Sequence, residues 1–349
     1  MSNEYYSQEL HGPYQLFDLG DFGLEDGGKI RSCKLAYATF GQLTSQKDNA
    51  ILILTWYSGT SKIMEQAYIG PGRAIDPDKY FIIIANQIGN GLSSSPHNTS
   101  APFNGIKFPH VRISDDVRAQ HRLITEKFGI ERLELVMGGS MGAPQTYEWA
   151  VRYPEIVKRA APIAGNPKVT PHEFVFLETL KEAITSDPAW QGGWYTEPHA
   201  VHQGLCKQAK LFALLGFTTE FFKQELWRAL DFSSLDDFLT GFLENYFLPL
   251  DPNNLLCMIR KAQANDVSRA TGGDLKEALS RIKAKTFVVA IDEDMLFPPR
   301  TCEAHQILIP NSELRVIHSL WGHNGLLGAD PEYVEQIEGN LGELLAAST

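Results

Sequence analysis

Residues 133–154, with the sequence LELVMGGSMGAPQTYEWAVRYP, decide the fold of this chain. The apolar residues before Gly138 form a run of strand length, and the five residues from Gly138 to Gly142 fit the pattern G-x-S-x-G. Residues 146–153 have the spacing of an amphipathic helix, and a proline follows them. This order predicts a strand, a sharp turn and a helix, with Ser140 at the centre of the turn.

Ser140 is the candidate nucleophile. A serine at such a turn has a strained backbone that pushes its hydroxyl out above the carboxyl end of the sheet. Glycines flank it because a Cβ atom there would collide with the strand or the helix. The amide of Met141, at the start of the helix, would point at the oxygen of a bound carbonyl group. The motif alone also fits a plain glycine-rich turn, but the flanking strand and helix favour the nucleophile.

The amino-acid composition limits the classes of protein to which this chain can belong. The chain has 349 residues, 43% hydrophobic and 21% charged, which suits a globular protein with one large core and an insertion. A net charge of −11 argues against a nucleic-acid groove or a basic membrane-binding face. Four widely spaced cysteines without a C-x-x-C pair predict no metal site, and we expect no cofactor. The N-terminal residues lack the features of a secretory signal, so we expect a reducing, cytoplasmic setting.

Other apolar runs predict further strands of the same sheet. A leading antiparallel hairpin is expected before residue 41, and buried strands are expected at 50–55, 80–85, 159–165, 286–291 and 314–317. Residues 114–128 have helical spacing, with Ser114 as the expected capping residue, and a last helix is expected from residue 331 to about 347. The alternation of strands and helices predicts an α/β fold with a mostly parallel central sheet flanked by helices.

A long segment interrupts this alternation. Residues 166–273 contain no strand-like run, and their aromatic and aliphatic residues recur at helical spacing. We therefore expect a helical lid insertion at 166–273, over a core formed by residues 1–165 and 274–349.

A serine nucleophile needs a base and a carboxylate that orients the base. In sheets of this kind the acid and the histidine follow the last strands, in that order. His323 is the preferred base because it lies in a glycine-containing loop after the final strand, whereas His318 ends the strand itself. The carboxylate could come from any of the three acidic residues at 292–294, because their position in the sequence alone does not distinguish them. The turn at 56–60 is where such a sheet supplies a second oxyanion amide, although it also fits an aromatic loop that roofs the core.

Several short stretches in the same order resemble the homoserine O-acetyltransferase family of α/β-hydrolases. They span nearly the whole chain and lie at residues 71–72, 75–76, 79–81, 108–109, 115–120, 138–142, 148–150, 294–298 and 322–323. The resemblance implies the α/β-hydrolase fold, with Asp294 as the acid of the triad and His323 as its base. It also implies that the amides of Met141 and Tyr57 form the oxyanion hole, and it favours a homodimer formed through lid helices.

Two positions depart from that family. Its acetyltransferases carry an aspartate directly after the histidine, where this chain has Asn324. A Tyr-Arg-Ser segment of their lid is replaced here around residues 217–219, which read Phe-Thr-Thr. An amide gives an ammonium group no ion pair, and threonine offers a carboxylate no bidentate fork. We therefore predict that both charged contacts for an amino-acid substrate are lost.

The expected activity is hydrolysis of a small, uncharged carboxylic ester through an acyl-enzyme on Ser140. The alternatives are an O-acyltransferase that uses acyl-CoA and an alcohol, a hydrolase of carbon–carbon bonds, and a catalytically silent receptor. Trp56 and Asn324 are the expected substrate contacts. The expected partner is a small-molecule ester, with no nucleic acid and no membrane. The aromatic residues Phe221, Phe222 and Trp227 fit either a dimer contact or an internal core of the lid.

Overall fold

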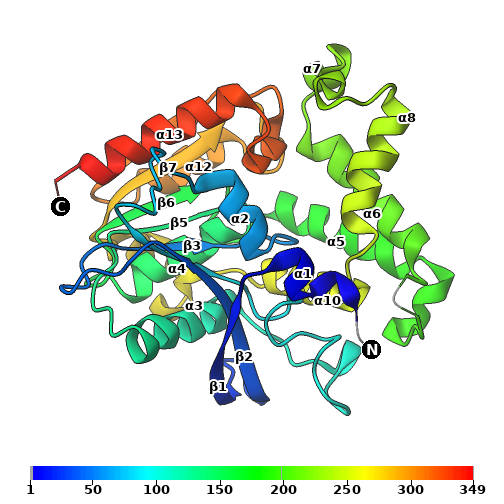
Figure 1. Cartoon of the computed structure of the whole chain (residues 1–349), viewed down its shortest axis with the longest axis horizontal. Helices are drawn as coiled ribbons and strands as arrows, with labels where there is room; N and C mark the ends of the chain where they lie inside the picture. The colour runs from blue at the N-terminus through cyan, green and yellow to red at the C-terminus, as the bar shows by residue number, and fades with distance from the viewer. Residues whose placement is uncertain (1–2, 198, 349) are drawn as a thin grey trace.

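An eight-stranded sheet forms the centre of the computed structural model, which describes residues 3–197 and 199–348 (Figure 1). The strand order is β1-β2-β4-β3-β5-β6-β7-β8, in which β1, β2 and β4 pair antiparallel and every later pair is parallel. The strands are β1 (Gln15–Gly23), β2 (Lys29–Phe40), β3 (Ala50–Leu54), β4 (Phe81–Ala85), β5 (Leu135–Gly139), β6 (Arg159–Ile163), β7 (Lys285–Ile291) and β8 (Ser312–Ile317). The predicted fold class and the leading hairpin are confirmed.

Two layers of helices cover the sheet, which explains why its inner strands are apolar throughout. Successive side chains of a strand point to opposite faces. In β3, Ile51 and Ile53 pack in one hydrophobic cluster, while Leu52 and Leu54 pack in the other. The first cluster includes residues of α2 (Ser61–Tyr68) and α13 (Pro331–Ala346), and the second includes residues of α3 (Ile113–Arg122), α4 (Gly142–Arg152), α11 (Leu275–Ser280) and α12 (Pro299–Gln306).

The chain between β6 and α11 forms a succession of helices joined by loops, and this part of the chain lies beyond one end of the strands in Figure 1. Before α11 it contains α5 (Pro171–Thr185), η4 (Pro188–Gly193), α6 (His202–Gly216), α7 (Thr219–Lys223), η5 (Leu226–Leu230), α8 (Leu235–Phe238), η6 (Leu239–Glu244), α9 (Asn245–Phe247), α10 (Pro252–Gln263) and η7 (Val267–Thr271). The short elements elsewhere are η1 (Glu4–Tyr6), α1 (Gln8–His11), η2 (Gly105–Lys107), η3 (Leu123–Lys127) and η8 (Gly322–Leu327). None of the described helices is both long and apolar enough to cross a membrane.

Two helix starts differ from the predictions. Helix α4 begins at Gly142, directly after the serine turn, and not at Thr146. Helix α3 begins at Ile113, so Ser114 is not its cap, and the Ser114 hydroxyl donates a hydrogen bond to the Glu25 carboxylate instead. The sequence pattern missed both starts because local tertiary contacts, and not helical periodicity, fix the first turn.

The aromatic residues of the inserted segment form its internal core. Phe221 is fully buried and Trp227 is 4% exposed. Phe221 stacks on Phe217 at 4.2 Å between ring centroids and meets Trp321, which follows β8, at 5.3 Å. Of the two readings that the sequence left open for this cluster, internal packing is therefore the one that the structure supports.

A fully buried ion pair joins the inserted segment to the sheet. The ammonium group of Lys261, in α10, contacts the carboxylate of Asp116, in α3, and both side chains have no exposed area. The Lys261 ammonium also donates to the backbone oxygen of Ile88 at 2.6 Å, and an Asp116 oxygen accepts from the Ile88 amide at 2.8 Å. Burial raises the pKa of Asp116 to about 6, so the Lys261 charge is needed to keep that carboxylate ionised.

Replacing Lys261 with methionine should therefore leave a buried, unpaired carboxylate and lower the free energy of unfolding by roughly 3–5 kcal/mol. Urea unfolding followed by tryptophan fluorescence measures the loss. Adding Asp116→Asn, which removes the charge and keeps an acceptor for the Ile88 amide, should recover part of it. An equal loss in the single and double variants would contradict this account.

Candidate active site

Ser140 lies on a strained turn between β5 and α4. Its φ angle is 51°, in the left-handed region that residues other than glycine rarely adopt. Its amide donates to the Ile163 oxygen of β6 at 2.9 Å, which ties the turn to the sheet. A Cβ atom on Gly142 would lie 2.6 Å from the Leu54 oxygen, and one on Gly138 would lie 2.7 Å from the Gly142 oxygen. Both contacts are with backbone atoms, so glycine is required at these two positions.

A chain of hydrogen bonds leads from Ser140 into the protein. The Ser140 Oγ lies 2.9 Å from Nε2 of His323, and Nδ1 of the same ring lies 2.7 Å from an oxygen of Asp294. The other Asp294 oxygen accepts hydrogen bonds from the amides of Leu296 and Phe297, at 2.8 and 3.0 Å. Asp294 is 2% exposed and His323 is 6% exposed. The arrangement can move a proton from the serine to the imidazole while a fixed carboxylate orients and balances the ring.

The competing histidine and acid form a separate pair on the surface. Nδ1 of His318 is hydrogen-bonded to the carboxylate of Asp292, and both side chains are exposed. This hydrogen bond and the Asp292 charge raise the pKa of His318. Position in the sequence did not distinguish Asp292 from Asp294, but their surroundings differ. Asp292 faces His318, while Asp294 faces His323.

The two amides expected to form an oxyanion hole follow Ser140 and β3. Within the described part of the chain, neither the Met141 amide nor the Tyr57 amide donates a hydrogen bond. The Tyr57 hydroxyl donates to Gln208 of α6 at 3.1 Å, and its ring stacks on Phe212 of the same helix. Free N–H groups beside a serine nucleophile suit the negative oxygen of a tetrahedral intermediate.

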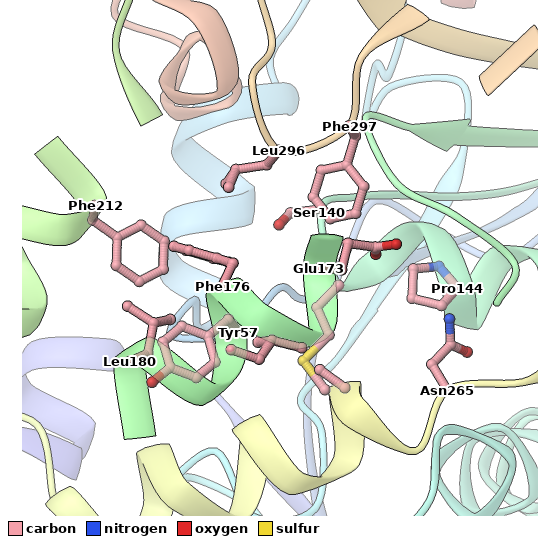
Figure 2. Close-up of a pocket in the computed structure, with 13 residues that line it drawn as sticks. Tyr57, Ser140, Pro144, Glu173, Phe176, Leu180, Phe212, Asn265, Leu296 and Phe297 are labelled. Atoms are coloured by element: carbon pink, nitrogen blue, oxygen red, sulfur yellow. The ribbon is translucent and has the colours of Figure 1, made fainter. Parts of the chain in front are cut away.

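Ser140 borders two cavities. The first is small, about 60 Å³, and mostly apolar (Figure 2). Figure 2 shows Ser140 between Phe297 and Leu296 on one side and the inserted-segment residue Phe176 on the other. This first cavity is lined by Tyr57, Ser140, Met141, Pro144, Glu173, Phe176, Leu177, Leu180, Phe212, Ala262, Asn265, Leu296 and Phe297.

The second cavity is larger, about 490 Å³, and it is bordered by His323. Trp56 and Asn324, the expected substrate contacts, both line it. The Asn324 amide nitrogen is buried without a hydrogen-bond partner in the described chain, and a Cβ atom on Gly216 would lie 2.5 Å from it. Tyr5 and His11 also line this cavity. No sequence motif pointed to these two residues, because they lie far along the chain from each of the motifs.

The segment at 217–219 uses its polar group within the protein. The Thr218 hydroxyl donates to the Leu320 oxygen and accepts from the Phe221 amide at 3.0 Å, which caps α7. Phe217 is 1% exposed. Neither residue offers a charged group to a ligand.

Comparisons with known proteins give consistent matches. A family model described as the alpha/beta hydrolase fold matches residues 67–330. An ethyl acetate hydrolase of Pseudomonas veronii is 55% identical over 99% of this chain and 99% of its own. The crystal structure of an acetylester hydrolase from Corynebacterium glutamicum is 54% identical, covers 99% of this chain and 100% of its own, and superposes with a TM-score of 0.98. A homoserine O-acetyltransferase of Trichormus variabilis is 34% identical over 88% of this chain and 87% of its own.

The two histidine–aspartate pairs predict different effects on the reactivity of Ser140. A fluorophosphonate modifies a serine only when a base activates it, so we expect Asp294→Asn to slow modification by roughly 10³–10⁴-fold. The matched variant Asp292→Asn should leave the rate unchanged. Mass spectrometry of the intact chain over time gives both rates, and the reverse ranking would assign the acid to Asp292.

Proposed function

Because the chain belongs to the alpha/beta hydrolase fold family and is related to homoserine O-acetyltransferases, we propose that it is a serine hydrolase of small carboxylic esters. The observation that carries the proposal is the hydrogen-bond chain from Asp294 through His323 to Ser140. The names of the two relatives at 54–55% identity, an ethyl acetate hydrolase and an acetylester hydrolase, support the same substrate class.

The mechanism follows from the positions of these groups. His323 Nε2 takes the proton from the Ser140 hydroxyl as the oxygen attacks the ester carbonyl. The amides of Tyr57 and Met141 stabilise the oxyanion. The intermediate collapses when the C–O bond to the alcohol breaks, and the alcohol leaves with the proton from His323. A water molecule then gives one proton to His323 and attacks the carbonyl carbon of the acyl-enzyme. The bond between that carbon and Ser140 Oγ breaks, His323 returns the proton to Oγ, and the carboxylic acid leaves.

We assign the two halves of the ester, the alcohol and the acyl group, to the two cavities. The departing alcohol receives its proton from His323, so it lies on the side of the larger cavity, which His323 borders. The acyl group then occupies the cavity of about 60 Å³ behind Leu296 and Phe297. A space of that size suits a methyl or ethyl group, so we propose acetyl and other short acyl esters as substrates.

Water is the proposed acceptor of the acyl group. Asn324 and Thr218 stand where family acetyltransferases carry charged contacts, and here they offer a neutral amide and a hydroxyl already used to cap α7. An amino-acid acceptor would find no charge partner at either position. These features support hydrolysis over transfer to homoserine.

The inserted segment, residues 166–273, is proposed to act as a lid and as a dimer contact. It supplies Phe176, Leu180 and Phe212 to the cavities, and exposed apolar residues such as Val175 and Leu214 lie on its outer surface. A homodimer through these helices would cover them. Light scattering that gives the mass of one chain would contradict this proposal.

We also propose a reducing, cytoplasmic setting. All four cysteines are free, and burial raises the pKa of the Cys33 and Cys302 thiols to about 12. Such thiols are unreactive and form no disulfide framework. The protein would be taken directly from cells and unfolded in denaturant, so that buried thiols also react. Titration that then finds fewer than four free thiols would oppose the proposal.

The acyl cavity predicts a steep preference for chain length. Values of kcat/KM for p-nitrophenyl esters should fall from acetate to hexanoate, and Leu180→Ala should raise the butyrate-to-acetate ratio by roughly tenfold, since one or two buried methylenes are worth 1–3 kcal/mol. The exposed residue Ile307 supplies the control, because Ile307→Ala should leave the ratio unchanged. If Leu180→Ala leaves the butyrate-to-acetate ratio unchanged, the acyl group does not bind in this cavity.

The direct test compares hydrolysis with transfer. We expect p-nitrophenyl acetate to be hydrolysed at a rate that added homoserine leaves unchanged, and Ser140→Ala to lower kcat by roughly 10⁴-fold or more. Acetyl-CoA should release CoA no faster in the presence of homoserine. Rapid CoA release that depends on an added alcohol would replace the proposal with an O-acyltransferase.

A further inference from the structure

A buried chain of side-chain amides lies directly behind the two proposed oxyanion turns. Gln145, in α4, donates through its amide nitrogen to two backbone oxygens, those of Thr55 at 3.0 Å and Met141 at 3.1 Å. Thr55 directly follows β3 and precedes the turn that carries the Tyr57 amide, while Met141 carries the other amide. One side chain with no exposed area therefore bridges both turns.

The orientation of the Gln145 amide is fixed by its neighbours. The Trp149 indole, which can only donate, gives its hydrogen to the Gln120 oxygen at 2.7 Å. The Gln120 nitrogen must then face Gln145, and it donates to the Gln145 oxygen at 2.8 Å. Gln145 is left with its nitrogen toward the two turns, so the donor-only indole sets the direction of the whole relay.

Gln87 holds the first turn from another side. Its amide nitrogen donates to the Thr55 oxygen at 2.7 Å and makes a longer contact, 3.4 Å, with the Trp56 oxygen. Its own oxygen faces the ammonium of Lys261 at 3.4 Å, again a group that can only donate. The Trp56 oxygen and the Tyr57 N–H belong to one trans peptide and point in opposite directions. Fixing that oxygen therefore turns the Tyr57 N–H away from Gln87.

Met141 is held on both sides as well. The Ser140 oxygen, which shares a peptide with the Met141 N–H, accepts from the Ala143 amide at 2.9 Å. The next oxygen, that of Met141, accepts from Gln145. A rotation of either turn would break a buried hydrogen bond and leave an unsatisfied polar group.

We propose that Gln145 is a positioning residue for ester hydrolysis, which holds the Tyr57 and Met141 amides at the spacing that the oxyanion requires, with Gln87 supporting the first turn. The inference rests on the proposed function and adds to it the groups that set the oxyanion hole. Oxyanion donors act on the transition state and not on the bound ester, so the residue should affect kcat and leave KM nearly unchanged.

The test uses Gln145→Met, which keeps the length of the side chain and removes the donor. With p-nitrophenyl acetate we expect kcat to fall by about tenfold or more, less than the 10²–10³-fold lost when an oxyanion donor is deleted, with KM within about twofold. Trifluoroacetone forms a tetrahedral oxyanion on the serine, so its inhibition constant should rise by a similar factor. The pH at which kcat/KM is half-maximal should not move, because the His323–Asp294 pair is untouched.

Asn98→Leu is the control. Asn98 also bridges two backbone oxygens, those of Gly91 and Ser93 at 3.0 Å each, and it lines neither of the cavities that Ser140 borders. The Asn98→Leu variant should lower the melting temperature and leave kcat unchanged. If Gln145→Met does not fold, the same measurements of kcat, KM and trifluoroacetone inhibition on Gln87→Met test whether these amides position the oxyanion turns.

Two results are distinguished by this design. An active wild-type enzyme in which Gln145→Met lowers only the melting temperature, with kcat and trifluoroacetone inhibition unchanged, would overturn the positioning role alone. Wild-type protein without esterase activity, or a Ser140→Ala variant that keeps it, would instead overturn the proposed function and the inference with it.

Discussion

The structure around the site depends on the close approach of the Ser140 turn to its neighbouring strands. Gly142 lies so near the Leu54 oxygen that no side chain fits between α4 and β3. The Ser140 backbone stays in a left-handed conformation because its amide is bound to Ile163 and its oxygen to Ala143. A strained backbone of this kind persists only where surrounding contacts fix it. Here strand β6 and the first turn of helix α4 supply those contacts and fix the backbone of the serine.

Charge is arranged in two different ways around this turn. The Asp294 carboxylate is buried, receives two amide hydrogen bonds and faces His323, whereas Asp292 and His318 make an equivalent pair in solvent. Solvent screens the charges of the Asp292–His318 pair. Neither of these two residues is among those that line the two cavities. Behind the turns, Trp149 and Lys261 act as donor-only ends of buried amide chains. The chemistry therefore lies on a polar layer inside an otherwise apolar core, and each member of that layer has a defined orientation.

The helices between β6 and α11 help to line the two cavities that Ser140 borders. They supply Phe176 and Leu180 to the smaller cavity and Phe212 to both. Lys261 ties the same segment to α3 through a buried ion pair, so at least α10 is fixed to the core. An aromatic cluster between the insertion and Trp321 adds a second attachment near the loop of His323. The walls of the cavities and the loop that carries His323 are thus parts of one packed unit.

The sequence by itself determined the strand-turn-helix at Ser140, the mostly parallel sheet and the order of serine, acid and histidine, because each depends on local periodicity or on glycine at a strained turn. It also separated His323 from His318 by position after the last strand. Position in the sequence left the acids at 292–294 undivided, and the family resemblance implied Asp294. The tertiary structure shows Asp294 facing His323 while Asp292 faces His318, because the loop turns the two side chains in different directions. Only the tertiary structure decided the start of α3, the division of the site into two cavities and the amide chain at Gln145. They depend on contacts between residues far apart in the chain, and no local pattern records which buried polar groups meet.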